Sequence, residues 1–240
     1  MKYNLIIIIL SASLIILTIF YFKNYKDLYR QSLELNLDPL QEKSITSEFN
    51  HKILAIGSSS IEYWPFEDIN LTDNILFNAG IGGQTSIQVL YRFERLILIH
   101  KPQYLIVQVG LNDIKSIGVL NNQGKIVGNL YSNLTKIFDL CELNNIIPIY
   151  ITNFPTGRRG ILRSMVWNRT LDSLIYDTNS EIKAICRDRD VYIFDAYELL
   201  VEPNSLKRKS EYSSDFLHLN SEGYNLLNKR FDLILRTIIK

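Results

Sequence analysis

The chain has 240 residues, of which 26 are Lys or Arg, 25 are Asp or Glu and 47% are hydrophobic. This length is enough for one sizeable core with an additional segment. The balanced charge gives no basic excess that would indicate nucleic-acid binding, and no acidic tail. The two cysteines, Cys141 and Cys186, lack a CxxC spacing and a histidine cluster, so we expect buried free thiols and no metal site. A bridge between the two is the alternative.

An apolar run without charges occupies residues 5–22, near the N-terminus. As a helix it would span roughly 27 Å, close to the thickness of a bilayer core. No small-residue cleavage site follows it, which favours an uncleaved transmembrane signal anchor over residues 1–23 rather than a removed signal peptide. One lysine precedes the run and three basic residues follow it, so the positive-inside rule alone would keep the rest of the chain in the cytoplasm.

A polar segment of mixed charge, residues 24–50, is predicted to be a linker with a short helix around Lys26–Leu35. Beyond it, short apolar runs alternate with amphipathic stretches. The predicted strands are 52–57, 75–79, 104–109, 147–153 and 191–195. The predicted helices are 85–99, 128–144, 161–188 with a break near Thr178–Ser180, and 221–239. This alternation predicts βαβ units with right-handed crossovers, and therefore one α/β/α domain with a parallel sheet over residues 51–240.

Three predicted strands end in polar or glycine-rich residues: Gly57–Ser60, Gly80–Thr85 and Gly110–Asp113. Because the carboxyl ends of parallel strands share one edge of the sheet, neighbouring strands would bring these segments together. Each segment alone is weak, since serine-rich and asparagine turns are usually structural. The first is not a nucleophile elbow, because Ile61 stands where the second glycine would be. The glycine segment lacks the fingerprints of nucleotide-binding loops.

A fourth segment, Asp215–His218, precedes the last predicted helix. An Asp and a His three residues apart can pair, which fixes the imidazole tautomer and leaves its second nitrogen as a base. The other two histidines fit this role less well. His51 precedes the first strand and His100 ends a helix, so both are expected at the opposite end of the sheet.

Together, the order and spacing of these segments resemble the SGNH/GDSL hydrolase family over residues 51–240. The matching motifs are Ser59 in G-x-S-x, Gly83 in N-x-G-x-G-G, Asn112 in G-x-N-D, and Asp215 with His218 in D-x-x-H. The resemblance implies a three-layer α/β/α sandwich with a five-stranded parallel sheet in the flavodoxin-like order 2-1-3-4-5. It also implies a serine ester hydrolase without cofactor or metal.

The resemblance further assigns roles to these residues. Ser59 would be the nucleophile, His218 the base and Asp215 the residue that orients it. The oxyanion hole would consist of the backbone N–H groups of Ser59 and Gly83 and the side-chain amide of Asn112. Acyl transfer needs such an activated hydroxyl and such donors. The sequence departs from the family at two positions, where Ser58 and Gln84 stand in place of the usual aspartates.

The expected substrate is an acyl ester, either an O-acetyl group on an envelope glycan or an acyl group of a lipid. By resemblance to envelope-acting members, and against the local charge count, the domain would face the periplasm or exterior. Two alternatives stay open: an O-acyltransferase to a glycan, and a catalytically silent anchored binding module. Arg158 and Arg159 could meet a carboxylate or phosphate, although an ordinary solvated loop is the more frequent outcome. The aromatic residues after the nucleophile are expected to pack beneath the first helix: Tyr63, Trp64 and Phe66.

Overall fold

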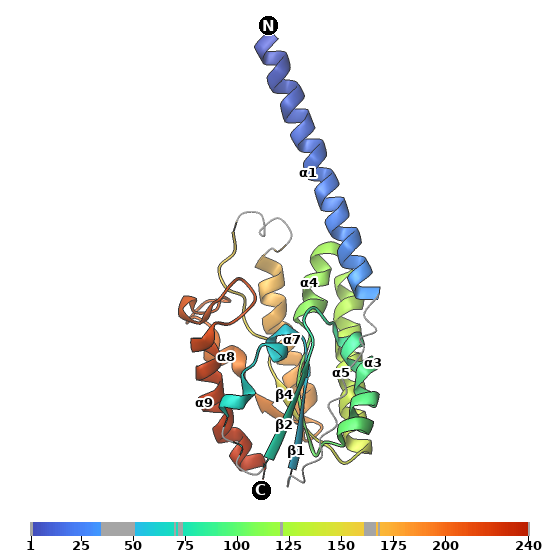
Figure 1. The fold of residues 1–240 in the computed structure, drawn as a ribbon, viewed down its shortest axis with the longest axis vertical. Coiled ribbons are helices and arrows are strands. Elements are labelled where there is room, and N and C mark those ends of the chain that lie inside the picture. The colour runs from blue at the N-terminus through green and yellow to red at the C-terminus, as the bar shows by residue number, and fades with distance from the viewer. Residues whose placement is uncertain are drawn as a thin grey trace. The chain divides into compact units, whose positions relative to one another are not determined.

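The computed structural model describes residues 2–34, 51–69, 71, 74–120, 122–160, 167 and 169–239. The chain divides into two compact units, Met1–Lys43 and Ser44–Lys240, each of which is treated by itself. The ribbon in Figure 1 labels the elements.

The first unit contains one helix, α1, which runs from Lys2 to Glu34. The predicted anchor segment and the short helix expected around Lys26–Leu35 form one continuous helix, because no glycine or proline interrupts this stretch. The segment Ile6–Leu28 has a mean hydropathy of 2.4 and is long enough to cross a membrane. Length and composition of this kind fit a membrane anchor and a signal sequence alike. Most of the predicted linker, residues 35–50, lies outside the described residues.

The second unit is built on a parallel sheet of five strands in the order β2-β1-β3-β4-β5. The strands are β1 (His51–Gly57), β2 (Asn74–Gly80), β3 (Tyr104–Gln108), β4 (Ile147–Ile151) and β5 (Tyr192–Phe194). The predicted α/β class and strand order are therefore confirmed, with strand ends that differ by a few residues. Since β2, β1 and β3 are adjacent, the segments that follow them emerge at the same edge of the sheet.

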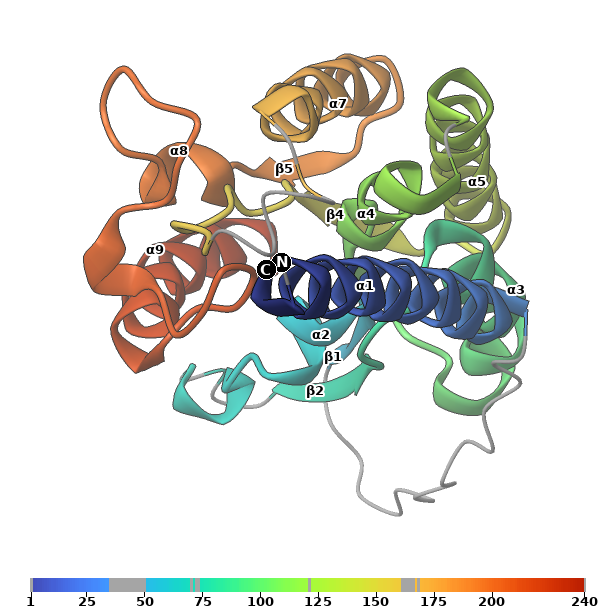
Figure 2. The same cartoon turned by 90° about the horizontal axis from the view of Figure 1, so that it is seen from above.

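Helices cover both faces of this sheet, as Figure 2 shows. One face carries α3 (Ser86–His100), α5 (Gln123–Leu143) and α7 (Arg169–Arg187), and the other carries α8 (Ala196–Leu200) and α9 (Ser221–Ile238). Strand β1 lies between β2 and β3 and is buried, so its side chains alternate between the two layers. Ile53 and Ala55 pack in the core that contains Leu227 and Phe231 of α9.

Two helical predictions needed correction. Helix α4 (Leu111–Leu120) was not predicted as a helix, although it begins directly after the turn at Gly110. The break expected near Thr178–Ser180 is wrong, because α7 continues without interruption. The hydroxyl groups there bond within the helix instead of ending it: Thr178 donates to Leu174 O at 2.7 Å and Ser180 to Tyr176 O at 3.0 Å. Residues 161–166 and 168 of that predicted helix lie outside the described residues.

Both cysteines are free and buried, as the sequence indicated. Burial raises the pKa of each thiol to about 12. A thiol of this kind is inert at neutral pH.

Candidate active site

Ser59 follows strand β1, which ends at Gly57, where the backbone turns sharply. A Cβ atom on Gly57 would lie 2.2 Å from the carbonyl oxygen of Gln108, so only glycine fits there. Ser59 then begins the short helix α2 (Ser59–Glu62). Two side chains from other elements hold this helix: Tyr224 donates to Ser60 O at 3.1 Å, and Asn78 donates to Ile61 O at 2.7 Å.

His218 and Asp215 reach this serine from a turn 159 positions along the chain. His218 Nε2 lies 3.1 Å from Ser59 Oγ, and His218 Nδ1 lies 2.8 Å from Asp215 Oδ2. The other carboxylate oxygen, Asp215 Oδ1, accepts from the backbone N–H groups of Leu217 at 2.6 Å and His218 at 2.7 Å. The three side chains thus form one continuous hydrogen-bonded series, and Asp215 is fixed through both of its oxygens.

Charge supports this arrangement. Partial burial of Asp215 would raise its pKa, but hydrogen bonds from the His218 ring and from two backbone N–H groups lower it to about 2. The carboxylate is therefore ionised at neutral pH and accepts the proton on Nδ1. In that tautomer Nε2 presents a lone pair toward Ser59 Oγ.

The glycine segment after β2 turns beside Ser59. The N–H of Ile81 donates to Gly57 O at 3.1 Å, which ties this segment to the end of β1. Gly83 has φ +79°, in the left-handed region, while a Cβ there would have no heavy atom within 4 Å. Glycine is therefore required at this position by backbone conformation and not by space.

The segment after β3 contacts the glycine segment that follows β2. Asn112 is the second residue of α4, and its side-chain Nδ2 donates to Gln84 O at 3.0 Å. The amide of Asn112 is thereby held against the glycine segment. The segments that follow β1, β2 and β3 consequently meet at one edge of the sheet. This is the arrangement expected from the sequence if the three strands are neighbours.

Buried polar groups brace these segments from behind. Asp113 accepts from the backbone N–H of Ser86 at 2.9 Å and from its hydroxyl at 2.6 Å, which joins α4 to α3. Burial raises the pKa of Asp113 to about 6, although the hydrogen bonds from Ser86 oppose that rise. Gln84 is fully buried, and its Oε1 accepts two hydrogen bonds from Arg92, at 3.0 and 2.8 Å. Gln84 therefore holds the glycine segment to Arg92, although it is a neutral amide at a position where the family usually has an aspartate.

The aromatic residues that follow Ser59 separate into two groups. Trp64 and Phe66 are buried and stacked, with ring centroids 5.0 Å apart, which agrees with the packing role expected for them. Tyr63 is 56% exposed, and its ring lies edge-on to the imidazole of His218, 5.4 Å between centroids. The spacing of the three aromatic residues did not indicate that Tyr63 differs from the other two. Helix α2 ends at Glu62, so Tyr63 and the residues after it do not continue the helical spacing.

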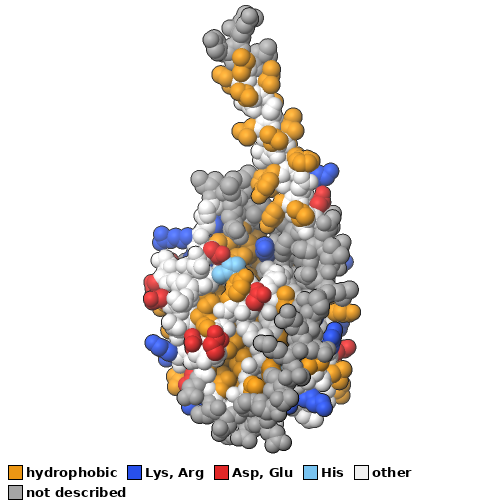
Figure 3. Space-filling view, in the orientation of Figure 1, with side chains coloured by type: hydrophobic (Ala, Val, Ile, Leu, Met, Phe, Trp, Pro, Cys, Tyr) orange, Lys and Arg blue, Asp and Glu red, His pale blue; other side chains and the backbone are white. Residues whose placement is uncertain are grey.

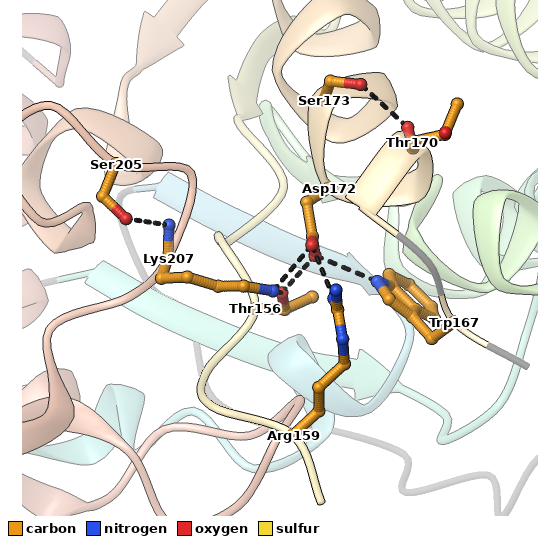
Figure 4. A network of polar contacts seen from close by, with 8 residues as sticks. All are labelled: Thr156, Arg159, Trp167, Thr170, Asp172, Ser173, Ser205 and Lys207. Atoms are coloured by element: carbon orange, nitrogen blue, oxygen red, sulfur yellow. Dashed lines mark hydrogen bonds and ion pairs between the residues drawn. The ribbon is translucent and has the colours of Figure 1, made fainter. Parts of the chain in front are cut away.

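The two arginines of the loop after β4 also differ. Arg158 is exposed, whereas Arg159 donates to Asp172 at 2.6 Å (Figure 4). Asp172 is buried and accepts from several groups besides this arginine: Thr156 Oγ1 at 2.6 Å, Trp167 Nε1 at 3.0 Å and Lys207 Nζ at 2.7 Å. Arg159 is therefore part of an internal network, an outcome that the sequence did not indicate.

Figure 3 shows one face of the molecule, where a histidine side chain lies at the surface near acidic and hydrophobic side chains. Within the described residues, no group of three or more His, Cys, Asp or Glu side chains is placed to hold a metal ion. The fold and these side chains define a class of α/β proteins in which a serine, a histidine and an aspartate gather at the carboxyl edge of a parallel sheet.

Comparison with known proteins names the family. Residues 63–226 match the model of the GDSL-like Lipase/Acylhydrolase family, and the chain belongs to this family. It is accordingly a carboxylic ester hydrolase, and the resemblance drawn from the motifs is confirmed. The matched range contains Gly83, Asn112, Asp215 and His218, and it begins shortly after Ser59. No curated protein sequence matches the chain.

Several solved structures share the fold. A GDSL-like lipase from Bacteroides thetaiotaomicron aligns with a TM-score of 0.67 at 20% identity, covering 91% of this chain and 100% of that one. The acetyl xylan esterase AlAXEase aligns with a TM-score of 0.62 at 19% identity, over 77% and 99% of the two chains. A catalytic mutant of Axe2, an acetylxylan esterase from Geobacillus stearothermophilus, gives 0.62 at 15% identity, over 81% and 97%.

Proposed function

We propose that the chain hydrolyses acyl esters with Ser59 as nucleophile, His218 as general base and acid, and Asp215 as the residue that orients the imidazole. The observation that carries this proposal is the continuous series of contacts from Asp215 Oδ2 to His218 Nδ1 at 2.8 Å, and from His218 Nε2 to Ser59 Oγ at 3.1 Å. Both distances lie within hydrogen-bond reach, which proton transfer requires.

In the first half of the reaction, Ser59 Oγ attacks the carbonyl carbon of the ester while His218 Nε2 takes the hydroxyl proton. The carbonyl oxygen becomes an oxyanion, which accepts from the backbone N–H groups of Ser59 and Gly83 and from the side-chain amide of Asn112. The ionised Asp215 stabilises the imidazolium. The carbon–oxygen bond to the alcohol then breaks, and His218 gives its proton to the departing alcohol.

In the second half, a water molecule attacks the acyl group on Ser59 after giving a proton to His218. The second tetrahedral intermediate occupies the same three donors. It collapses to the free acid as His218 returns the proton to Ser59 Oγ. Each half therefore uses the same geometry, with His218 first as a base and then as an acid.

For the substrate, we propose a short acyl ester of a carbohydrate, an O-acetyl group above all. Two structural neighbours carry the name acetyl xylan esterase, which supports this choice. The exposed ring of Tyr63 beside His218 offers a sugar a flat apolar surface with a polar end. We further propose that α1 anchors the enzyme and that the catalytic unit faces the periplasm or exterior, where envelope glycans occur.

The test uses the full-length chain in detergent with p-nitrophenyl acetate and acetylated xylan as substrates. Ser59→Ala should lower kcat by at least about 10⁴-fold. Ser60→Ala is the matched control, because Ser60 is the adjacent buried serine and should leave activity near that of the unmodified enzyme. Undiminished activity of Ser59→Ala would refute the assignment of the nucleophile.

The same assays separate the alternatives. An acyltransferase would pass the acyl group to an added glycan, so the acceptor would gain acyl groups while release of free acid falls. A silent binding module would fail to react with a fluorophosphonate probe even though it remained folded. We expect release of free acid in the presence of the glycan, and probe labelling that Ser59→Ala removes.

A further inference from the structure

We propose that Arg208 is the positioning residue that sets the Asp215–His218 turn within reach of Ser59. The inference rests on the proposed function, since the position of this turn matters for activity only if its side chains act on the serine. Arg208 lies between α8 and the 3-10 helix η2 (Ser210–Tyr212), in a segment that the sequence motifs did not single out.

Arg208 is 0% exposed, which is unusual for an arginine. Its guanidinium donates to backbone carbonyl oxygens and one hydroxyl instead of to a carboxylate. The contacts are Nε to Ser213 Oγ at 2.9 Å, Nη1 to Leu217 O at 3.0 Å and Pro155 O at 3.3 Å, and Nη2 to Asp215 O at 2.6 Å and His218 O at 2.9 Å. Three of these acceptors belong to the turn that carries Asp215 and His218.

The carbonyl of Phe216, which Arg208 does not reach, accepts from the N–H of Gly157 at 2.8 Å. Every carbonyl from residue 215 to residue 218 is therefore occupied. The turn forms no helix or strand of its own at these positions, although the N–H of Ser214 also donates to His218 O at 3.0 Å. Together with that bond, the contacts of Arg208 and Gly157 fix the path of its backbone. The side chains of Asp215 and His218 extend from that backbone, and their directions follow from its path.

The chemistry of this position suits arginine alone. A guanidinium has five N–H donors in a rigid plane, and here they have five acceptors. A buried cation without an anionic contact is costly, and burial lowers the pKa of Arg208 to about 10 despite the opposing charge of Asp215. An apolar side chain would avoid that cost but would remove the guanidinium donors to Asp215 O and Leu217 O, and would leave His218 O only the backbone N–H donors of Ser214 and Asp215.

The first test is Arg208→Lys in the full-length chain. The ammonium keeps the charge but cannot reproduce the planar array of donors, so the turn should shift. A displacement of about 1 Å costs about 10² in rate, and we expect kcat to fall by about that factor while KM is unchanged. The matched control is Arg236→Lys, because Arg236 is an exposed arginine of α9 that pairs with Asp232 at 2.8 Å. It should keep the activity of the unmodified enzyme.

A second measurement separates positioning from loss of fold. Arg208→Ala and Arg208→Gln are assayed with guanidinium chloride below denaturing concentrations, against sodium chloride at the same ionic strength. Guanidinium should raise kcat saturably in at least one of these variants and should not do so in the unmodified enzyme. Circular dichroism and the unfolding midpoint report the folded fraction in every case.

The proposal is overturned if Arg208→Lys has the kcat of the unmodified enzyme. It is also overturned if the loss of activity in every Arg208 variant matches its unfolded fraction and guanidinium restores nothing. Ser59→Ala is measured in parallel. If that variant stays active, the proposed function fails; if it is inactive while Arg208→Lys is unimpaired, the positioning role alone fails.

Discussion

Two aspartates of this enzyme, Asp172 and Asp215, each accept several hydrogen bonds and have lowered pKa values, but they differ in exposure and in their hydrogen-bond partners. The side chain of Asp172 is 1% exposed, and each of its oxygens accepts from two groups of the internal network in Figure 4. The side chain of Asp215 is 58% exposed and accepts from two backbone N–H groups and one imidazole.

The difference lies in the partners. The described partners of Asp172 include two cations, Lys207 and Arg159, which close the network around the carboxylate. Asp215 instead pairs with a ring that has a second nitrogen, and that nitrogen lies against Ser59. Under the proposed function, Asp215 acts through the second nitrogen of its partner, whereas the described partners of Asp172 have no such contact with Ser59. The number of hydrogen bonds alone does not distinguish the two aspartates.

The largest effect is expected from Asp215→Asn. The amide would favour the wrong imidazole tautomer, so kcat should fall by about 10⁴-fold. Because Asp215 is mostly exposed, the free energy of unfolding should change little. Initial rates and urea unfolding of the same preparation check both statements. A variant with normal kcat would place the orienting role elsewhere.

Asp172→Asn should show the reverse pattern. Removing this charge leaves Lys207 and Arg159 without their anion, which typically costs about 3–5 kcal/mol of stability. Catalysis per folded molecule should persist. Urea unfolding followed by tryptophan fluorescence is suitable, since Trp167 donates to Asp172. Asp139→Asn is the control: its pair with Arg189 is exposed and should contribute less than about 1 kcal/mol. If Asp172→Asn and Asp139→Asn lowered the free energy of unfolding equally, the buried network of Asp172 would not have the stabilising role expected of it.

Asn112→Ala tests the donor side of the site. Loss of one oxyanion donor should lower kcat by about 10²–10³-fold. The variant also loses the hydrogen bond to Gln84 O, so KM and the unfolding midpoint must be measured with kcat. A rise in KM with unchanged kcat would mean that Asn112 binds the ground state and does not stabilise the transition state.

Acid stability gives the smallest effect. The hydrogen bonds to Asp215 and Asp172 outweigh burial and lower both pKa values, that of Asp215 to about 2. The stability they contribute is complete above the ordinary pKa of 3.8 and is lost as pH falls through the lowered values. The free energy of unfolding should therefore decline below about pH 4. Asp172→Asn should flatten that decline more than Asp215→Asn, because solvent screens the exposed group. If Asp215→Asn reduced the acid-dependent loss of stability more than Asp172→Asn, the exposed aspartate would contribute more to acid stability than the buried one, contrary to this prediction.

Helix α7 illustrates where local reading of the sequence failed. Polar residues at 178–180 suggested a break, yet their hydroxyl groups bond to carbonyls one turn earlier and α7 continues. The network of Asp172 was missed for a related reason. Its members come from the loop after β4, from α7 and from the segment around Lys207, and no fixed spacing in the sequence connects them.

The sequence by itself predicted the parallel sheet and the meeting of the segments after its first three strands, because strand periodicity and glycine-rich strand ends are local properties and parallel strands share one carboxyl edge. The assignment of Ser59, Gly83, Asn112, Asp215 and His218 came from the order of their motifs, which resembles the SGNH/GDSL family. Only the tertiary structure decided which other side chains support that site. Arg208 reaches carbonyl oxygens, which every residue possesses, and Tyr63 reaches His218 across the fold. Contacts of that kind depend on the path of the folded backbone, so they cannot be predicted from residue type and spacing.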